Sequence, residues 1–196
     1  MIRVISDFIL KLWGWKMIGR FPGDVPKLIV IIAPHTSNWD FILGILAKYS
    51  LQIRASYLGK EELFRFPFGW IFRKLGGYPV DRFNRSNKVN AVVELFKKND
   101  RFILALSPEG TRSRVENLRT GFYHMAVKAG VPLLMVGLDF GKKEIVIDHP
   151  FALSGHMEND FKKIFNFYRG MKGKRPHLGI DHLIDSKSET EKEELK

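Results

Sequence analysis

The chain has 196 residues, 45% of them hydrophobic, and a formal net charge of +11 from 32 basic and 21 acidic residues. This length and composition exclude a disordered chain and suit one domain with its own core. The absence of cysteine excludes disulfides, thiolate metal sites and a cysteine nucleophile. The positive charge predicts an anionic partner: nucleic acid, an anionic membrane surface or a phosphorylated substrate.

The N-terminal residues predict an amphipathic helix over 2–18. At helical spacing one narrow row is polar, and most other positions are large and apolar; the row consists of Arg3, Asp7, Lys11 and Gly14. Two interpretations stay open: the helix lies in a membrane interface with Trp13 and Trp15 at headgroup level, or it docks on the protein's own core. The longest run without a charged residue, 28–39, is too short to cross a bilayer, so no spanning segment is expected.

Strand and helix patterns alternate along the rest of the chain. The apolar, β-branched run 28–33 predicts a strand that is buried on both faces. Further helices are expected at 38–50, 60–75, 87–99, 120–129 and 157–169, and further strands near 53–58, 101–106, 132–138 and 143–148. This alternation predicts an α/β fold with a mostly parallel central sheet flanked by helices. Residues 1–20 would form the amphipathic helix, 21–184 a single domain, and 185–196 a charged tail.

A histidine and an aspartate follow the first strand in the sequence HTSNWD. Within one regular helix, His35 and Asp40 would not share a face. If a helix begins near Ser37, however, SNWD forms a capping box, and Asp40 reaches back toward His35. The pair is then either a solvated turn histidine with a capping acid, or a catalytic dyad in which His35 takes a proton and Asp40 orients it. The position at the carboxyl end of a strand favours the dyad.

A second polar loop, SPEGTRSR at 107–114, follows the strand expected at 101–106. Its hydroxyl, carboxylate and guanidinium groups suit the binding of a phosphate, with the loop amides as further donors. The alternative is a surface turn that holds an internal Glu–Arg ion pair. Because this loop also follows a strand, it should open at the same edge of the sheet as His35.

Two further segments carry basic residues. A short third strand within 76–82 would deliver Arg82 to the same edge, either as a phosphate ligand or as a salt-bridge partner. In 64–72, five aromatic rings lie among basic residues. That pattern suits a membrane interface, an apolar channel, stacking on single-stranded nucleic acid, or ordinary core packing.

Taken together, these motifs resemble the glycerolipid acyltransferase superfamily, which includes the 1-acylglycerol-3-phosphate (lysophosphatidic acid) acyltransferases. The resemblance covers roughly 28–140. The matching blocks are His35 with Asp40, Gly77 with 79–82, Pro108 to Ser113, and 131–133, with Arg119 and Gly121 in the lead-in to the last. The sequence departs from the family pattern at Pro34, Ser107 and Met135, which indicates a divergent subfamily.

The resemblance implies acyl transfer from acyl-CoA or acyl-carrier protein to a lysolipid hydroxyl, with 1-acylglycerol-3-phosphate as the expected acceptor. It assigns the general base to His35 and its orientation to Asp40. It assigns the substrate phosphate to Arg82, Glu109, Gly110, Thr111 and Arg112, with Arg119, Gly121 and Pro132 as secondary candidates. Amides near 109–111 are candidate oxyanion donors. No cofactor and no metal is implied, and the enzyme would sit peripherally on the cytoplasmic face of a membrane.

Three alternatives remain from the residues themselves. A thioesterase would use His35 to activate water in place of an alcohol. A metal-dependent hydrolase would use His35, Asp40, Glu109 and His124, although no familiar ligand spacing supports it. A nucleic-acid-binding module fits the charge and the aromatics, but no recognised motif makes nucleic acid an expected partner.

Overall fold

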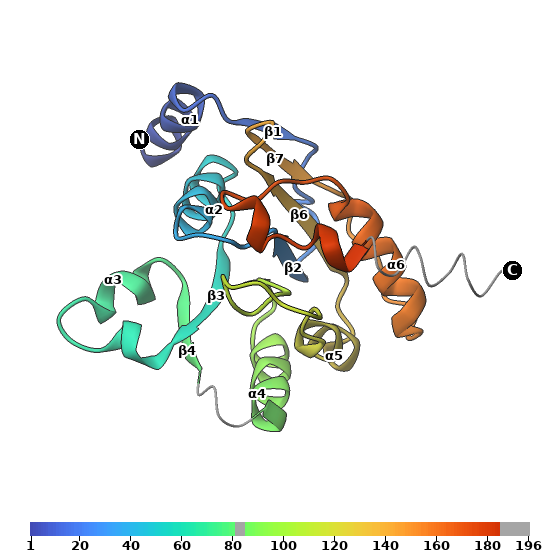
Figure 1. Cartoon of the computed structure of the whole chain (residues 1–196). Helices are drawn as coiled ribbons and strands as arrows, with labels where there is room; N and C mark the ends of the chain where they lie inside the picture. Colours follow the sequence, from blue (N-terminus) through green and yellow to red (C-terminus); the bar gives the residue numbers. More distant parts are fainter. Residues whose placement is uncertain (81–84, 185–196) are drawn as a thin grey trace, which may run out of the picture.

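The structure is a computed structural model that describes residues 1–80 and 85–184 (Figure 1). Within these ranges the strands form one seven-stranded sheet in the order β1-β7-β6-β2-β5-β3-β4. The strands are β1 (Lys16–Ile18), β2 (Lys27–Ala33), β3 (Ala55–Lys60), β4 (Gly77–Val80), β5 (Phe102–Leu106), β6 (Leu133–Asp139) and β7 (Glu144–Ile147). β2 to β6 are parallel to one another, whereas β7 is antiparallel to β6 and β1 pairs in parallel with β7. This confirms the predicted α/β fold with a mostly parallel sheet.

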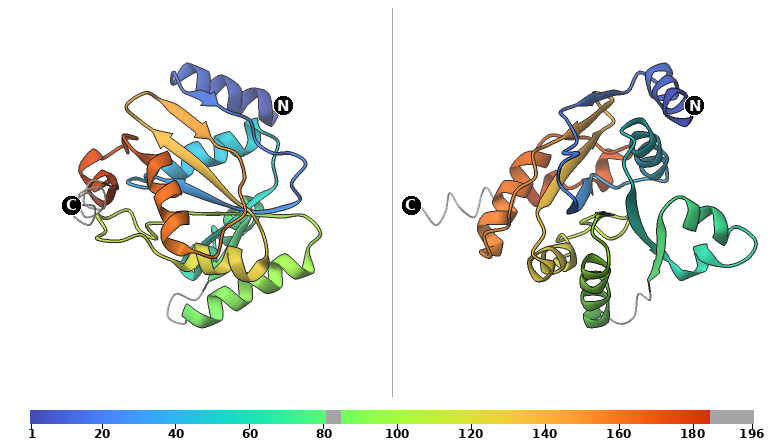
Figure 2. Two further views of the ribbon diagram at one scale, coloured as in Figure 1. Left: turned by 90° about the vertical axis from the view of Figure 1, so that its right-hand side faces the viewer. Right: turned by 180° about the vertical axis from the view of Figure 1, so that it is seen from behind.

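Helices cover both faces of the sheet (Figure 2). The helices are α1 (Ile2–Leu12), α2 (Trp39–Ser50), α3 (Gly69–Lys74), α4 (Arg85–Lys98), α5 (Gly121–Ala129) and α6 (Met157–Tyr168). Alternate residues of β2 point to opposite faces: Ile29 and Ile31 pack in one core with α4, α5 and α6, and Leu28 and Val30 pack in a second core with α1 and α2. Because β2 is buried on both faces, it reads as a continuous apolar run in the sequence.

Two of the predicted elements are wrong in extent. The helix expected over 2–18 ends at Leu12, Gly14 adopts a φ of +76°, and 16–18 forms the edge strand β1 instead. The helix expected over 60–75 is divided into a 3₁₀ turn, η1 (Glu61–Phe64), and the short α3. Pro67 lies between the two pieces, and a proline has no N–H with which to continue a helix.

Helix α1 docks on α2 by one edge. Ser6 and Leu10 are buried, the Ser50 hydroxyl donates to the Asp7 carboxylate, and the rings of Trp13 and Trp39 meet edge to face with centroids 5.6 Å apart. The opposite face of α1 is exposed and apolar; it consists of Ile2, Val4, Ile5, Phe8 and Leu12. Over the residues that the structure describes, no helix has the length and apolar character to cross a bilayer.

Candidate active site

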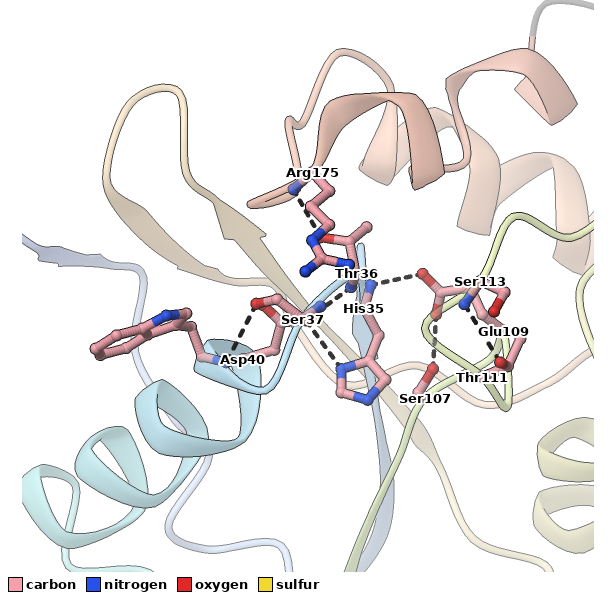
Figure 3. A network of polar contacts seen from close by, with 10 residues as sticks. His35, Thr36, Ser37, Asp40, Ser107, Glu109, Thr111, Ser113 and Arg175 are labelled. Atoms are coloured by element: carbon pink, nitrogen blue, oxygen red, sulfur yellow. Dashed lines mark hydrogen bonds and ion pairs between the residues drawn. The ribbon is translucent and has the colours of Figure 1, made fainter.

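The two polar loops lie side by side because their strands are neighbours. β2 pairs in parallel with β5, so the loops that follow Ala33 and Leu106 emerge at the same edge of the sheet. Figure 3 shows the HTSNWD loop and the SPEGTR loop meeting there. The carboxyl edge of a parallel sheet is where open α/β folds bind their ligands.

His35 and Asp40 form a pair at this edge. The distance from His35 Nδ1 to Asp40 Oδ2 is 3.1 Å, and the side chain of Asp40 is 1% exposed, compared with 26% for His35. An ionised carboxylate only accepts hydrogen bonds, so Nδ1 carries the ring proton and Nε2 keeps its lone pair. The pair therefore has the hydrogen-bonding arrangement of an oriented general base, with Nε2 as the basic atom.

The local backbone explains the geometry of Asp40 and keeps the contacts of the predicted SNWD capping box. Helix α2 begins at Trp39 with Asn38 as its N-cap, one residue later than expected. Asn38 makes no side-chain cap, and the Trp39 amide donates to the Ser37 hydroxyl at 3.1 Å. Asp40 Oδ2 accepts the amides of Thr36 at 2.7 Å and Ser37 at 2.8 Å. The Ser37 hydroxyl donates to Asp40 Oδ1 at 3.1 Å. The carboxylate thus holds the loop that carries His35, in addition to holding the imidazole.

Glu109 joins the two loops from behind the site. Its carboxylate accepts the His35 amide at 2.7 Å and the Ser107 hydroxyl at 2.7 Å, and the residue is 1% exposed. Burial raises the pKa of the Glu109 carboxyl, and the hydrogen bonds from the His35 amide and Ser107 act in the opposite direction. Because both oxygens bind protein donors, the contacts of Glu109 position the histidine backbone.

A cavity of about 930 Å³ opens in front of His35. One part of its wall is polar or basic and comes from the SPEGTR loop and the start of α5; it includes Thr111, Arg112, Arg119, Thr120 and His124. Another part is apolar and lies between α2 and the sheet; it includes Phe21, Val30, Ile32, Leu51, Leu138 and Ile147. The cavity therefore offers a basic region and a long apolar region to one ligand.

Most of the residues singled out from the sequence meet in this cavity. His35 and Asp40 line it together with five others: Gly110, Thr111, Arg112, Arg119 and Gly121. Gly110 has a φ of +66°, and its amide donates to the Ser107 carbonyl at 3.2 Å, so this amide is already engaged. Arg82 lies outside the described residues.

Pro132 is not brought to the site. Its carbonyl accepts the Ile29 amide at 3.0 Å, close to the start of β2, whereas His35 follows the end of that strand. Pro132 therefore lies at the amino edge of the sheet, the edge opposite the two polar loops.

The chain after α6 also supports the site, which no sequence pattern indicates. The Arg175 amide donates to Thr36 Oγ1 at 3.1 Å (Figure 3). A Cβ at Gly173 would lie 2.6 Å from the Thr36 side chain, so this backbone packs directly on the HTSNWD loop. The side chain of His124 reaches the cavity as well, although the sequence suggested it only for the rival metal site. Among the described residues, no three His, Cys, Asp or Glu side chains are grouped so as to hold a metal ion.

His35, oriented by a buried carboxylate, lies beside a large and mainly apolar cavity at the carboxyl edge of an α/β sheet, an arrangement that suits proton abstraction from a bound hydroxyl. Comparison with known proteins agrees. The family model described as Acyltransferase matches residues 23–139. The chain belongs to this acyltransferase family, and the resemblance to the glycerolipid acyltransferases is confirmed.

Several similar proteins are 1-acyl-sn-glycerol-3-phosphate acyltransferases. The chain is 28% identical over 187 residues to a 1-acyl-sn-glycerol-3-phosphate acyltransferase of Haemophilus influenzae, covering 85% of this chain and 77% of that protein. It is 36% identical over 137 residues to the enzyme of the same name from Salmonella typhimurium, covering 65% of this chain and 54% of the relative. It therefore spans only about half the length of the Salmonella relative.

A solved structure has the same fold. The crystal structure of the 1-acyl-sn-glycerophosphate (LPA) acyltransferase PlsC from Thermotoga maritima matches with a TM-score of 0.56 and 21% sequence identity. The match covers 83% of this chain and 74% of that one.

Proposed function

We propose that the protein transfers a fatty acyl chain from a thioester, acyl-CoA or acyl-carrier protein, to the free hydroxyl of a lysolipid, with 1-acylglycerol-3-phosphate as the acceptor. The observation that carries this proposal is the His35–Asp40 pair, which faces a cavity with both a basic and an apolar region. A phosphate and an acyl chain on one acceptor match these two regions. The names of the relatives in Haemophilus and Salmonella support the same substrate.

In the proposed reaction His35 Nε2 takes the proton of the acceptor hydroxyl as the hydroxyl oxygen attacks the thioester carbonyl carbon. A tetrahedral intermediate with a negatively charged oxygen forms. The carbon–sulfur bond then breaks, and the thiolate takes the proton back from the imidazolium. Asp40 stabilises the imidazolium between these steps. The nucleophile belongs to the substrate and the thioester is already activated, so the proposed chemistry uses no metal and no redox cofactor.

Arg112 and Arg119 are the described cations that we assign to the acceptor phosphate, because both line the basic region of the cavity. Arg82 keeps the same assignment from the motif alone. Thr111 orders this region, since its hydroxyl accepts the Ser113 amide at 3.3 Å. We assign Glu109 to the positioning of His35 rather than to the phosphate, because a buried carboxylate repels an anion.

We further propose that the enzyme works peripherally at a membrane, on the cytoplasmic face. The exposed apolar face of α1 supports this, because such a face on a docked helix suits the interface between headgroups and acyl chains.

The test is a panel of lysolipids assayed with both thioester donors, for the wild type, His35→Ala and the control His149→Ala. His149 is exposed and does not line the cavity. We expect His35→Ala to lower product formation by at least about a hundredfold, the lower scale of general-base catalysis, and His149→Ala to leave it unchanged. Near-normal turnover in His35→Ala would refute the dyad. Release of free fatty acid without diacyl lipid would identify a thioesterase instead.

A further inference from the structure

The 55–80 segment consists of β3, β4 and the connection between them; it lies at one edge of the sheet, its connection 61–76 projects from that edge, and it has a core of its own (Figure 1). Phe64 is buried, its ring meets Phe72 edge to face at 6.3 Å, and its carbonyl accepts Arg73 Nη1 at 2.9 Å. A Cβ at Gly59 or Gly77 would lie 2.8 Å from the Phe64 ring. The segment is therefore packed around Phe64. The aromatic rings on its outer surface are not needed to fill this small core.

Three large rings cover the tip of this segment and face solvent. Phe66 is 97% exposed, and Phe68 and Trp70 are each 64% exposed. The stretch 60–74 contains four basic residues and two acidic ones, and Arg65 and Arg73 flank the exposed rings. Exposed aromatic rings next to cations are the composition of surfaces that sit at the boundary between lipid headgroups and acyl chains.

A second cavity, of about 710 Å³, lies between this segment and the first turn of α1. Its cationic side chains are Arg3, Lys48, Arg54 and Lys74, and no carboxylate lines it. The Lys48 amine donates to the Leu75 carbonyl at 2.7 Å, and Arg3 pairs with Asp7 at 3.6 Å. Within the described part of the chain, Arg54 and Lys74 make no ion pair. This basic hollow therefore has two cations available for an anion.

The hollow lies beside the catalytic cavity and shares part of its wall. The views in Figures 1 and 2 place α1 and the 55–80 segment on the same side of the molecule, with α2 between them. Four residues line both the hollow and the catalytic cavity: Lys48, Ile53, Ala55 and Ser56. A lipid held in the hollow would therefore lie against the wall of the catalytic cavity.

We propose that the 55–80 segment is a second membrane-contact element, separate from α1, and that the basic hollow binds the phosphate of an anionic phospholipid in the bilayer. The rings of Phe66, Phe68 and Trp70 enter the interface, and Arg54 and Lys74 contact the headgroup. This membrane contact rests on the proposed function in one respect: the acyl acceptor is a lipid that the enzyme takes from a membrane. The charge of the hollow selects anionic headgroups over zwitterionic ones.

The test measures flotation of the full chain with vesicles of equal parts phosphatidylcholine and phosphatidylglycerol, and with vesicles of phosphatidylcholine alone. We expect Phe66→Ser with Trp70→Ser to weaken binding to both vesicles by about tenfold. We expect Arg54→Ala with Lys74→Ala to remove the preference for the anionic vesicle. The matched controls are Val127→Ser, an exposed apolar residue on α5, and Lys98→Ala, an exposed lysine at the end of α4. Both controls should bind like the wild type.

A second measurement follows Trp70 directly. With brominated phosphatidylcholine in the anionic vesicle, the wild type should lose more tryptophan fluorescence than Trp70→Phe, because Trp70 enters the bilayer. Equal quenching of the two proteins, or unchanged flotation of the Phe66 and Trp70 double variant, would overturn the proposal. The proposal would also be overturned if the Phe66 and Trp70 double variant bound vesicles normally but no longer bound a single-stranded oligonucleotide or acyl-carrier protein. The exposed rings would then serve that macromolecule instead of a membrane.

Turnover of a short-chain, water-soluble acceptor without vesicles separates this inference from the proposed function. The segment and hollow variants should keep that turnover, since none of their residues is assigned to the chemistry. Absence of that turnover in the wild type counts against the proposed reaction and leaves the vesicle result to decide the membrane contact.

Discussion

Replacement of Asp40 by asparagine tests how the carboxylate acts. Three donors converge on Asp40 Oδ2: the amides of Thr36 and Ser37, and His35 Nδ1. In Asp40→Asn the amide oxygen must take this position, because an NH₂ group there would face three donors. The imidazole then keeps its orientation and tautomer, and the variant loses mainly the negative charge.

The cost of that loss follows from the 3.1 Å distance between His35 Nδ1 and Asp40 Oδ2. At an effective dielectric constant of about 20, a full charge pair at this distance is worth about 5 kcal/mol. If about half of the imidazolium charge has developed in the transition state, the loss is about 2.5 kcal/mol, or roughly seventyfold in rate. We therefore expect kcat to fall by this factor with little change in the KM of either substrate.

The assay is the initial rate of diacyl product formation at saturating thioester, with urea unfolding of the same samples. The control is Ser37→Ala, which removes the hydroxyl that donates to Asp40 Oδ1 but leaves the charge beside His35. We expect it to cost about 1 kcal/mol of stability and less than about tenfold in rate. The reasoning is refuted if Asp40→Asn stays within about threefold of the wild type, or if Ser37→Ala is equally slow.

Three further predictions follow from contacts in the site and the core. Glu109→Gln should change how stability depends on pH. The pKa of the Glu109 carboxyl is raised in the folded protein, so the wild type should lose stability relative to the variant as pH rises from the unfolded pKa to the folded pKa. The loss in that window is about 1.4 kcal/mol per pH unit. Arg112→Ala should raise the KM for lysophosphatidate by about tenfold or more, because a charge-assisted hydrogen bond to phosphate is lost. Tyr168→Phe should destabilise the fold by about 1 kcal/mol, since the buried hydroxyl donates to the Ile31 carbonyl at 2.7 Å.

Each of the three has its own check. Urea unfolding at a series of pH values would show parallel curves for wild type and Glu109→Gln if Glu109 ionised normally. Arg114 is exposed and does not line the cavity, so Arg114→Ala should keep the KM, and an equal rise in both variants would argue against a phosphate role for Arg112. For Tyr168→Phe the measurement is the urea midpoint, and an unchanged midpoint would show that the hydroxyl adds nothing to stability.

The sequence predicted the elements that have a strong local signal. The run 28–33 could be identified as a central strand because burial on both faces leaves no polar position in it. The pairing of His35 with Asp40 followed from the order of strand, turn and helix. Strand β1 could not be predicted, because its three residues are all exposed and follow an apolar helix without a change in composition.

The start of α2 follows from contacts within the local SNWD pattern, whereas the role of Glu109 depends on a contact that no local pattern contains. Asp40 accepts the Ser37 amide and the Ser37 hydroxyl accepts the Trp39 amide, as the SNWD capping box predicts, and α2 begins one residue later than expected. The sequence predicted Glu109 in the phosphate pocket because its neighbours in the SPEGTR loop carry hydroxyl and guanidinium groups that suit a phosphate. Its burial and its bond to the His35 amide exist only once β2 and β5 are paired.

The hydrogen bond between the His35 amide and Glu109 joins positions 74 residues apart. No short stretch of chain can form it, so it requires that the entropy of closing this long loop has already been overcome. The geometry around His35 consequently cannot form before β5 pairs with β2, and it is lost when the two strands separate. Recovery of activity after dilution from urea should therefore follow the docking of the two central strands, and should lag behind the recovery of helical signal.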